Sequence, residues 1–453
     1  MTASPTTLLL FNYDWDRAGF ARQALGCQEK TRGFAEAGFD LFRFPDNTRL
    51  AWFDMARMVD RLARRAKKSG WRAVISNHEQ FGALTAALLA QRMGWPGTAP
   101  QAIIACQHKL HARHVLAEVC PEANVAHGLI DAPYGAPIPP GLPYPVFVKP
   151  IKAAFSVLAR EVKNAEELHA HTRFGWGERW IIEHLVEPFE RIARSYLPQA
   201  GTAHRLMWEA PSQAAQFNLD GYVFKGQATK IGVTDSIMYP GTQAFMRFAY
   251  PSRLPENVQQ RALDVAARFL AAVGFTHGVF NMEFFYDAVS QRLSVIEFNP
   301  RMASQLADLY LRVEGIDLYA VQLALAHGED PAQLPRLTPT AGAAASFVYR
   351  SFDPQRCPPP PSAAQHKAFA QQFPDAFLLN FPSTAQGRAR DNKWLGSHRY
   401  AIVHLGGRDE NALRERCLQA SALFGWPAPY AESAPLPAAS KEQIFTEFLG
   451  ETP

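Results

Sequence analysis

Two glutamates and two asparagines within the stretch Gly278–Arg301 are the first candidates for chemistry in this sequence. Two runs of alternating polar and apolar residues flank a polar DAVSQR segment, which is the pattern of an antiparallel β-hairpin. A turn centred near residue 290 places Glu283 opposite Glu297. The same register places Asn281 opposite Asn299. These polar side chains are therefore expected to share one face of the hairpin.

The opposed glutamates need a counterion. Directly opposite residues on neighbouring strands have Cβ atoms about 4.5–5.5 Å apart, and like charges placed so are destabilising. A shared divalent cation would offset the repulsion, because two carboxylates and an amide oxygen suit Mg²⁺. The predicted ligands are Glu283, Glu297 and Asn299, with Mn²⁺ as an alternative metal. A solvated hairpin whose glutamates are neutralised by Lys or Arg elsewhere in the chain fits the same spacing.

The other face of the predicted hairpin is apolar and is expected to pack against the core. An amphipathic helix, Glu256–Val273, leads into it. The residues on this face are Phe280, Met282, Phe284, Ile296 and Phe298.

Strands alternate with helical patterns in the first part of the chain, which predicts a small parallel α/β layer. The predicted strands are Thr7–Asn12, Phe39–Phe44 and Trp71–Ser76. Ligands bind at the carboxyl ends of such strands, so Asn77, His78 and Glu79 are candidates to line a cleft. The alternative is that they cap the following helix.

Two more strand patterns lie in the middle of the chain. Pro145–Pro150 (PVFVKP) ends on Lys149 and its proline, and Trp180–Val186 (WIIEHLV) carries Glu183. The segment Glu187–Pro211 has an irregular pattern and receives no assignment. A proline-rich tract near residues 331–361 marks a change in composition, after which a small α+β piece is predicted.

Composition excludes several classes of function. The formal charge of +4 is small for 453 residues and no Lys/Arg run of nucleic-acid type is present, so no nucleic-acid partner is expected. The five scattered cysteines lack metal spacing and fit a reducing compartment. No secretion signal and no apolar run long enough to span a bilayer is found. A cytoplasmic protein without a membrane partner is expected.

Several short motifs occur together in one order. Lys109, VFVKP, WIIEHLV, MEFF and VIEFNPR resemble the ATP-grasp superfamily in order and spacing. The resemblance is to its carboxylate–amine ligase branch, which includes carnosine synthase and bacterial amino-acid ligases. It implies an α/β and α+β fold with a pre-ATP-grasp α/β domain (residues 1–120), an ATP-grasp domain (121–330) and a C-terminal α+β piece (331–453). Within the ATP-grasp domain, a small lobe of about 121–187 precedes a large lobe of about 188–330.

The resemblance also implies roles for individual residues. Lys109 and Lys149 match lysines that contact ATP phosphates, and Arg301 matches an arginine that steadies phosphate or the tetrahedral intermediate. The two glutamates and Asn299 of the hairpin match the Mg²⁺ ligands. The segment matching the hinge that hydrogen-bonds adenine consists of Glu183, His184, Leu185 and Val186.

The sequence departs from the family pattern in three places. The loop after VKP carries no glycine, so Ser156 and local amides are the expected phosphate contacts there. Gln216 stands where an acidic residue usually meets the ribose. Arg247, in a loop that often offers a carboxylate, indicates an anionic group on one substrate. Gln305 is a further candidate substrate contact.

The function that the resemblance implies is ATP-dependent ligation of a small carboxylate to an amine, with amino acids as the expected substrates. The substrate carboxylate would be phosphorylated to an acylphosphate, and ADP and phosphate would be released. Two alternatives stay open, an ATP-binding module without turnover and a kinase of a small-molecule acceptor. Relatives are often dimers, so a homodimer is expected.

Overall fold

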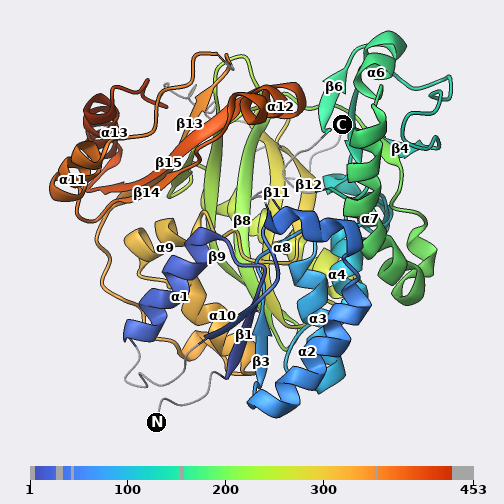
Figure 1. Ribbon diagram of the computed structural model, residues 1–453, viewed down its shortest axis with the longest axis horizontal. Helices are drawn as coiled ribbons and strands as arrows, with labels where there is room; N and C mark the ends of the chain where they lie inside the picture. Colours follow the sequence, from blue (N-terminus) through green and yellow to red (C-terminus); the bar gives the residue numbers. More distant parts are fainter. Residues whose placement is uncertain (1–5, 27–33, 42–44, 154–157, 354, 431–453) are drawn as a thin grey trace, which may run out of the picture.

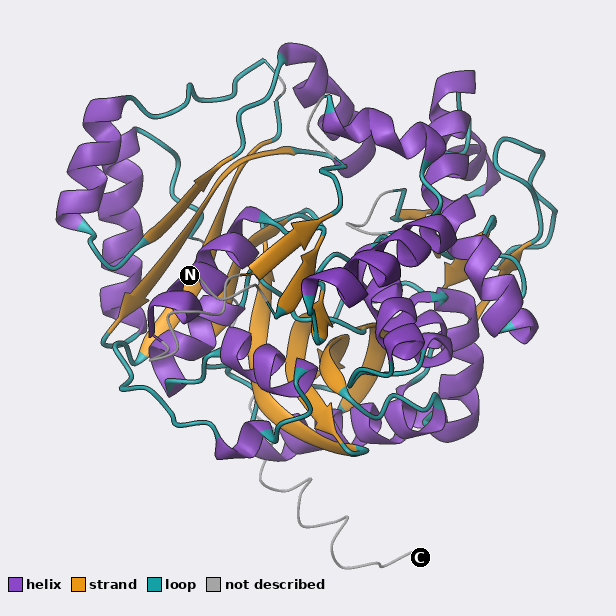
Figure 2. Ribbon diagram, turned by 60° about the horizontal axis from the view of Figure 1, so that its bottom comes forward, coloured by secondary structure: helices purple, strands orange, loops and turns teal. Residues whose placement is uncertain are grey.

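The computed structural model describes residues 6–26, 34–41, 45–153, 158–353 and 355–430 (Figure 1). Three β-sheets organise these residues, with three, four and eight strands. Helices cover the sheets on their outer sides, as the second view shows (Figure 2). Among the described residues, no helix combines the length and apolar character needed to cross a bilayer.

The N-terminal sheet is the predicted parallel α/β layer, with strand order β2-β1-β3. Its strands are β1 (Thr7–Leu10), β2 (Phe34–Ala37) and β3 (Ala73–Ile75). The prediction of a strand at Phe39–Phe44 is wrong, because the second strand ends at Ala37; residues 42–44 lie outside the described part. The helices around this sheet are α1 (Asp14–Gly26), α2 (Met55–Ser69), α3 (Gly82–Met93), α4 (Pro100–Gln107) and α5 (Lys109–Val119).

The small sheet is antiparallel, with strand order β4-β7-β5-β6. Its strands are β4 (His127–Ile130), β5 (Val146–Pro150), β6 (Arg160–Val162) and β7 (Leu206–Glu209). Two helices lie between β6 and β7 in the chain, α6 (Ala165–His171) and α7 (Trp176–Tyr196). The predicted strand Trp180–Val186 is wrong, because these residues lie inside α7.

The large sheet has eight strands in the order β12-β11-β8-β9-β10-β13-β15-β14. Its strands are β8 (Ala215–Phe224), β9 (Gln227–Met238), β10 (Phe245–Tyr250), β11 (Gly278–Asp287), β12 (Arg292–Asn299), β13 (Ala343–Ser351), β14 (Phe377–Asn380) and β15 (His398–Gly407). Its helices are α8 (Glu256–Ala272), α9 (Ala307–Glu314), α10 (Leu318–Ala326), α11 (Ala363–Gln372), α12 (Ala385–Leu395) and α13 (Glu410–Phe424). Strands on both sides of residue 330 thus form one sheet, through the pairing of β10 with β13.

The predicted hairpin is β11 and β12, and its register at the polar end is as expected. Glu283 pairs with Glu297 and Asn281 with Asn299. A β-bulge follows, so that Phe284 pairs with Val295 rather than with Ile296. Ile296 is therefore only partly buried, and its predicted place in the core is taken by Val295, which is 1% exposed.

The apolar face of the hairpin packs on α8, as expected. Phe298 stacks on Phe269 of that helix with ring centroids 3.8 Å apart. Phe280, Met282 and Phe284 are all buried in the same core cluster. This packing fixes the opposite, polar face of the hairpin toward α5 and the N-terminal layer.

Candidate functional site

The acidic pair lies on adjacent strands and is held by neutral groups. Gln216 on β8 donates from Nε2 to Oε2 of Glu283 at 2.9 Å, and Asn299 donates from Nδ2 to Oε1 at 3.4 Å. Burial, with the Glu297 charge second, raises the pKa of Glu283 to about 8. The positive charges of Arg301 and Lys109 lower this pKa, but they do not offset the effect of burial.

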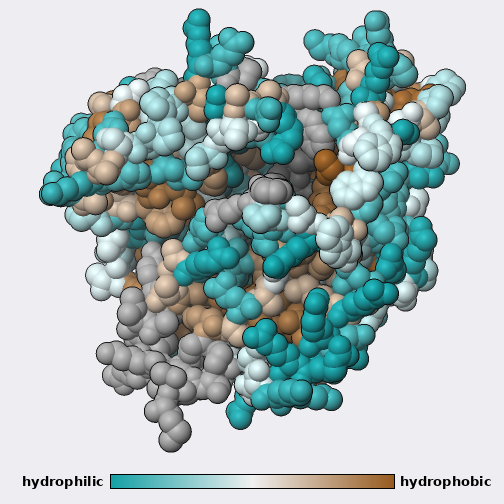
Figure 3. Space-filling view, viewed as in Figure 1, coloured by the Kyte–Doolittle hydropathy of each residue, from teal (hydrophilic) through white to brown (hydrophobic). Residues whose placement is uncertain are grey.

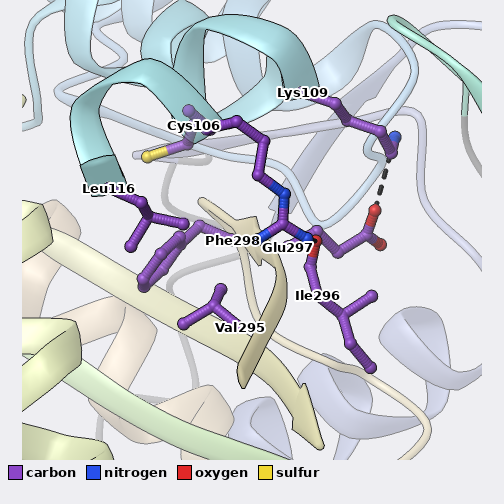
Figure 4. A pocket seen from close by; sticks show the side chains of 9 residues that line it. Cys106, Lys109, Leu116, Val295, Ile296, Glu297 and Phe298 are labelled. Atoms are coloured by element: carbon purple, nitrogen blue, oxygen red, sulfur yellow. Dashed lines mark hydrogen bonds and ion pairs between the residues drawn. The ribbon is translucent and has the colours of Figure 1, made fainter. Parts of the chain in front are cut away.

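Glu297 is paired with Lys109, whose Nζ lies 3.3 Å from its Oε2 (Figure 4). The lysine is the first residue of α5, its backbone N–H donates to the Ile151 carbonyl at 3.1 Å, and its Nζ donates to the Ala153 carbonyl at 2.8 Å. Although burial opposes it, the carboxylates of Glu297 and Glu79 raise the pKa of Lys109. Neutralisation by lysine, the alternative to metal, thus accounts for one of the two glutamates.

A small cavity lies behind Glu297, between the hairpin and α5 (Figure 4). Among the candidate residues, Lys109 and Glu297 line it. Its walls are otherwise mostly apolar and include Cys106, Leu116, Val295 and Phe298. The cavity therefore borders one member of the acidic pair and its lysine partner, while most of its remaining wall is apolar.

Lys149 points to the same hairpin from β5. Its Nζ lies 2.9 Å from Oε1 of Glu209 and donates to the Ile296 carbonyl at 3.3 Å. Arg113 on α5 donates from Nε to the same Glu209 oxygen at 2.7 Å. Although burial opposes it, Arg113 and Lys149 lower the pKa of Glu209 to about 2. The sequence prediction missed Glu209, whose only signal is an acidic residue closing the short apolar run LMWE.

Arg301 lies at the end of β12 and joins the hairpin to the N-terminal layer. Its NH2 donates to Oε2 of Glu79 at 2.5 Å and to Oδ1 of Asn299 at 3.3 Å. Although burial opposes ionisation, Arg301 and Lys152 lower the pKa of Glu79. Glu79 therefore contributes to the site, as the position after a parallel strand predicted.

The two residues before Glu79 have other roles. His78 accepts a hydrogen bond from the Phe81 backbone N–H at 3.3 Å, in the turn before α3, and no side chain caps that helix at its N-cap residue Phe81. Asn77 donates to Asp16 at 2.8 Å and accepts from Gln322 at 2.6 Å, which ties β3 to α1 and α10. Neither residue contacts the acidic pair.

A second residue that the sequence prediction missed is Lys152. It is 2% exposed, its Nζ donates to the Glu79 carbonyl at 3.2 Å, and it lies 5.0 Å from the centroid of the Phe189 ring. Burial lowers the pKa of Lys152 to about 7. Within the described part of the chain, Lys152 has no ion pair, so its charge is available for an anion.

The residues of the expected adenine hinge do not form the strand predicted for them. Glu183, His184, Leu185 and Val186 lie in the middle of α7, where backbone groups pair along the helix except that Pro188 offers no N–H to the His184 carbonyl. The Leu185 carbonyl also accepts a hydrogen bond from Nε2 of Gln80 at 2.7 Å. Most backbone groups of this segment are thus engaged within the helix, and its contact with adenine stays a prediction.

The substrate candidates Arg247 and Gln305 lie on opposite faces of the large sheet. Arg247 is 2% exposed and its guanidinium lies 4.1 Å from the Tyr430 ring, on the face covered by α13. The next residue, Phe248, points to the face that carries Glu283. The structure therefore does not bring Arg247 to the acidic pair.

Gln305 donates to Oγ of Ser346 at 2.9 Å, on the same face as the acidic pair. Gln216 reaches the pair itself, through Glu283. Ser156 lies outside the described residues. Of the predicted residues, the structure thus brings together Lys109, Lys149, Gln216, Glu283, Glu297, Asn299 and Arg301.

The two glutamates and Asn299 supply only part of the oxygen ligands that a divalent cation needs. No group of three or more His, Cys, Asp or Glu side chains with metal-binding geometry occurs in the described part of the chain. Glu283 and Glu297 supply two carboxylates and Asn299 an amide oxygen, so a bound Mg²⁺ would need further oxygens. Phosphate groups, attracted by the surrounding cations, are a ligand of that kind.

Comparison with known proteins agrees with this geometry. The family model for the ATP-binding domain of the carbamoyl-phosphate synthase L chain matches residues 225–334, which include the hairpin. Carnosine synthase 1 of Gallus gallus is 29% identical over 264 residues, covering 56% of this chain and 27% of the relative. D-alanine–D-alanine ligase of Synechococcus sp. (strain CC9605) is 28% identical over 160 residues, covering 35% of this chain and 40% of the relative.

The chain thus spans less than about half the length of these two curated relatives. Among solved structures, the L-amino acid ligase from Bacillus licheniformis superposes with a TM-score of 0.62 at 13% identity, covering 94% of this chain and 98% of that one. By name, these proteins are a carnosine synthase, a D-alanine–D-alanine ligase and an L-amino acid ligase, and the fold of the last is shared over nearly the whole chain. The chain has the ATP-grasp fold, and its family match and distant relatives lie in the ATP-grasp superfamily.

Proposed function

We propose that this protein is an ATP-dependent ligase that joins a small carboxylate to an amine through an acylphosphate and releases ADP and phosphate. The observation that carries the proposal is the placement of the Glu283–Glu297 pair among the cations Lys109, Lys149 and Arg301. Opposed acidic groups within a ring of cations are suited to a metal-bound polyphosphate, which presents both signs of charge.

The cations would hold the nucleotide phosphates. Lys109 and Lys149 approach the hairpin from the N-terminal layer and from the small sheet, and Lys152 lies in the loop directly after β5. Lysine supplies a compact charge to a phosphate oxygen without requiring a glycine-rich backbone. Lys152 thereby offsets the absence of glycine in IKAAFS, the feature that favours a binding module without turnover.

Glu283, Glu297 and Asn299 would hold Mg²⁺, whose charge would offset that of the phosphates. The substrate carboxylate then attacks the γ-phosphorus, and the bond to the β-phosphate oxygen breaks to give ADP and an acylphosphate. The amine attacks the acyl carbon, and phosphate leaves as the amide forms. Arg301 presents a planar donor fork beside Asn299, where it can stabilise the oxyanion of that step.

The adenine would bind at the connection from β7 to β8 instead of at residues 183–186. β7 pairs with the strand that carries Lys149, and it is the last strand of the small sheet before the chain enters the large sheet. The surface is indented between the small-sheet side and the C-terminal strands, above the large sheet (Figure 3). A nucleotide lying there would reach the cations and the acidic pair together.

The test is ATP turnover by the purified protein with Mg²⁺, with and without a mixture of the common L-amino acids. The proposal predicts that ADP and free phosphate form in equal amounts and that both depend on the mixture. ADP without phosphate would instead indicate a kinase. Absence of turnover in every mixture, with ATP still bound, would contradict the proposal and favour a binding module.

A further inference from the structure

Two arginines face each other near one end of the large sheet. Arg350 on β13 is paired with Arg399 on β15, next to a β-bulge. Like charges directly opposite on neighbouring strands are destabilising. Burial, with the Arg350 charge second, lowers the pKa of Arg399 to about 10. This arrangement places two cations together as the hairpin places two carboxylates together.

The contacts of these arginines leave their charge largely uncompensated. Arg350 donates to two neutral acceptors, the Phe245 carbonyl at 3.2 Å and Oγ of Ser397 at 3.0 Å. The Arg399 guanidinium lies 4.1 Å from the centroid of the Phe381 ring. In the described ranges, no carboxylate forms an ion pair with either arginine.

The carboxylate that acts on both arginines is Asp391, at longer range. It accepts a hydrogen bond from Nδ1 of His398 at 2.9 Å and is also within ion-pair distance of Arg390. One carboxylate shared in this way does not balance two facing guanidinium groups. The pair therefore has the charge and the free donors needed to bind a further anion.

The arginine pair lies on the same side of the sheet as the acidic pair. Arg350 follows Tyr349, which contacts Trp426 on the opposite, α13-covered side. The Phe381 ring beneath Arg399 lies 6.4 Å from Trp15 of α1, in the N-terminal layer. Trp15 also stacks on His404 with centroids 6.1 Å apart.

A continuous row of side chains connects the two pairs. The strand register aligns Gln216, Ser236, Phe248, Ser346 and His404 across one face of the sheet. Gln216 hydrogen-bonds Glu283 at one end of this row, and His404 contacts Trp15 at the other. Partly buried Tyr13 lies near enough to both arginines that Arg301 opposes the rise in the pKa of Tyr13 and Tyr13 opposes the fall in the pKa of Arg399. The arginine pair thus borders the same region as the proposed reaction centre.

We propose that Arg399, supported by Arg350, binds the carboxylate of an amine substrate that is itself an amino acid. This inference rests on the proposed ligase function. Amide formation consumes the carboxylate of one substrate, whereas an amino acid that attacks through its amine keeps its own carboxylate. That group must be held away from the γ-phosphate, and a planar guanidinium binds it through two parallel hydrogen bonds. Trp15 and Phe381 would contact the substrate's apolar atoms.

Binding measurements test this subsite without requiring turnover. Calorimetric titration of the full chain with each common L-amino acid, with and without Mg²⁺ and a non-hydrolysable ATP analogue, is compared with titration of the corresponding amino-acid amides. We expect at least one amino acid to bind and its amide to bind at least about tenfold more weakly. Arg399→Gln should weaken amino-acid binding at least about tenfold, and Arg399→Lys should weaken it less.

The matched control is Arg408→Gln, because Arg408 lies just after β15 with its side chain 87% exposed and paired with Asp409. This variant should bind amino acids as the unaltered protein does, and the ATP analogue should bind Arg399→Gln with unchanged affinity. Unchanged amino-acid binding by Arg399→Gln, equal binding of acids and amides, or no binding of any amino acid would overturn the proposal. Loss of the ligase function is detected separately, as the absence of amino-acid-dependent phosphate release.

Discussion

Glu283 and Glu297 are held in the folded protein at a cost in free energy, because their facing carboxyl groups are partly withdrawn from water. The fold tolerates this in two different ways. Lys109 neutralises Glu297 at 3.3 Å, whereas Glu283 receives only neutral donors from Gln216 and Asn299. Burial and the neighbouring Glu297 charge then raise the pKa of Glu283. A residue held in this state is suited to take up a cation.

Replacing Glu283 with Gln should therefore stabilise the metal-free protein at alkaline pH. The pKa of Glu283 is raised to about 8, so the folded state loses stability as the pH rises from the ordinary pKa of a glutamate toward 8. Glu283→Gln removes that dependence and should raise the free energy of unfolding at pH 9 by on the order of a few kcal/mol, because each unit of pKa shift corresponds to about 1.4 kcal/mol. Urea unfolding at pH 5 and pH 9 measures it.

With Mg²⁺ and an ATP analogue present, the unaltered protein should have a larger free energy of unfolding than Glu283→Gln. The control is Glu256→Gln, whose side chain is 73% exposed and paired with Lys230. Equal stability of Glu283→Gln and the unaltered protein at both pH values would show that Glu283 carries no buried charge.

Lys152 gives a second prediction at this scale. Its pKa of about 7 means that the free protein loses this charge as pH rises through neutrality. We expect the KM for ATP to rise between pH 6 and pH 8.5, and Lys152→Gln to raise it about tenfold at pH 6 and to flatten the profile. Lys68→Gln, on the exposed face of α2, should leave the profile unchanged. A Lys152→Gln profile equal to that of the unaltered protein would exclude a phosphate contact.

Among the elements, the hairpin was predictable and α7 was not. Alternation over β11 and β12 fixes which residues share a face, so the pairing of Glu283 with Glu297 followed from the sequence. The β-bulge did not, because one extra residue leaves the alternation on each side intact. Because of the bulge, Val295 rather than Ile296 pairs with Phe284 and is buried in the core.

The failure at α7 has a different cause. Residues 180–186 are rich in β-favouring side chains, and Pro188 interrupts the pattern that follows. The buried residues of the helix nevertheless recur at helical spacing: Ile182, Val186, Phe189 and Ala193. The signal was present over a longer window, and the short strand-like run concealed it.

Glu209 on β7 gives the prediction at this scale. Its pKa is lowered to about 2, so its ion pairs stabilise the protein above its ordinary pKa and are lost as pH falls toward 2. Glu209→Gln leaves Arg113 and Lys149 without their buried carboxylate, which costs about 3–5 kcal/mol. Denaturant unfolding should show a smaller free energy of unfolding for the variant than for the unaltered protein at pH 7, and a smaller difference between the two at pH 3.

The comparison for this variant is Glu122→Gln, which removes a carboxylate that is 56% exposed and paired with Arg268. It should change stability by less than about 1 kcal/mol. If Glu209→Gln changed the stability as little as Glu122→Gln, then Arg113 and Lys149 would have another counterion.

Across the whole molecule, the site depends on contacts between distant segments. Glu79, Lys109, Lys149 and Glu209 come from four separate elements and meet at one end of the hairpin. Family resemblance supplied the two lysines, but no local pattern marks Glu79 as the partner of Arg301, 222 residues away. The pairing of β10 with β13 likewise joins strands that are distant in the sequence. Such pairings depend on the complete fold rather than on local periodicity.

The most direct test of the account compares amino-acid-dependent phosphate release from ATP by the unaltered protein, Glu283→Gln and Glu297→Gln. We predict that the unaltered protein requires Mg²⁺ and loses turnover when the metal is chelated. Each Gln variant should be folded and slower by about 100-fold or more, because the charge that holds the metal at the phosphates is missing. Phosphate release at the unaltered rate by both variants would contradict the claim that this pair of glutamates holds the catalytic metal.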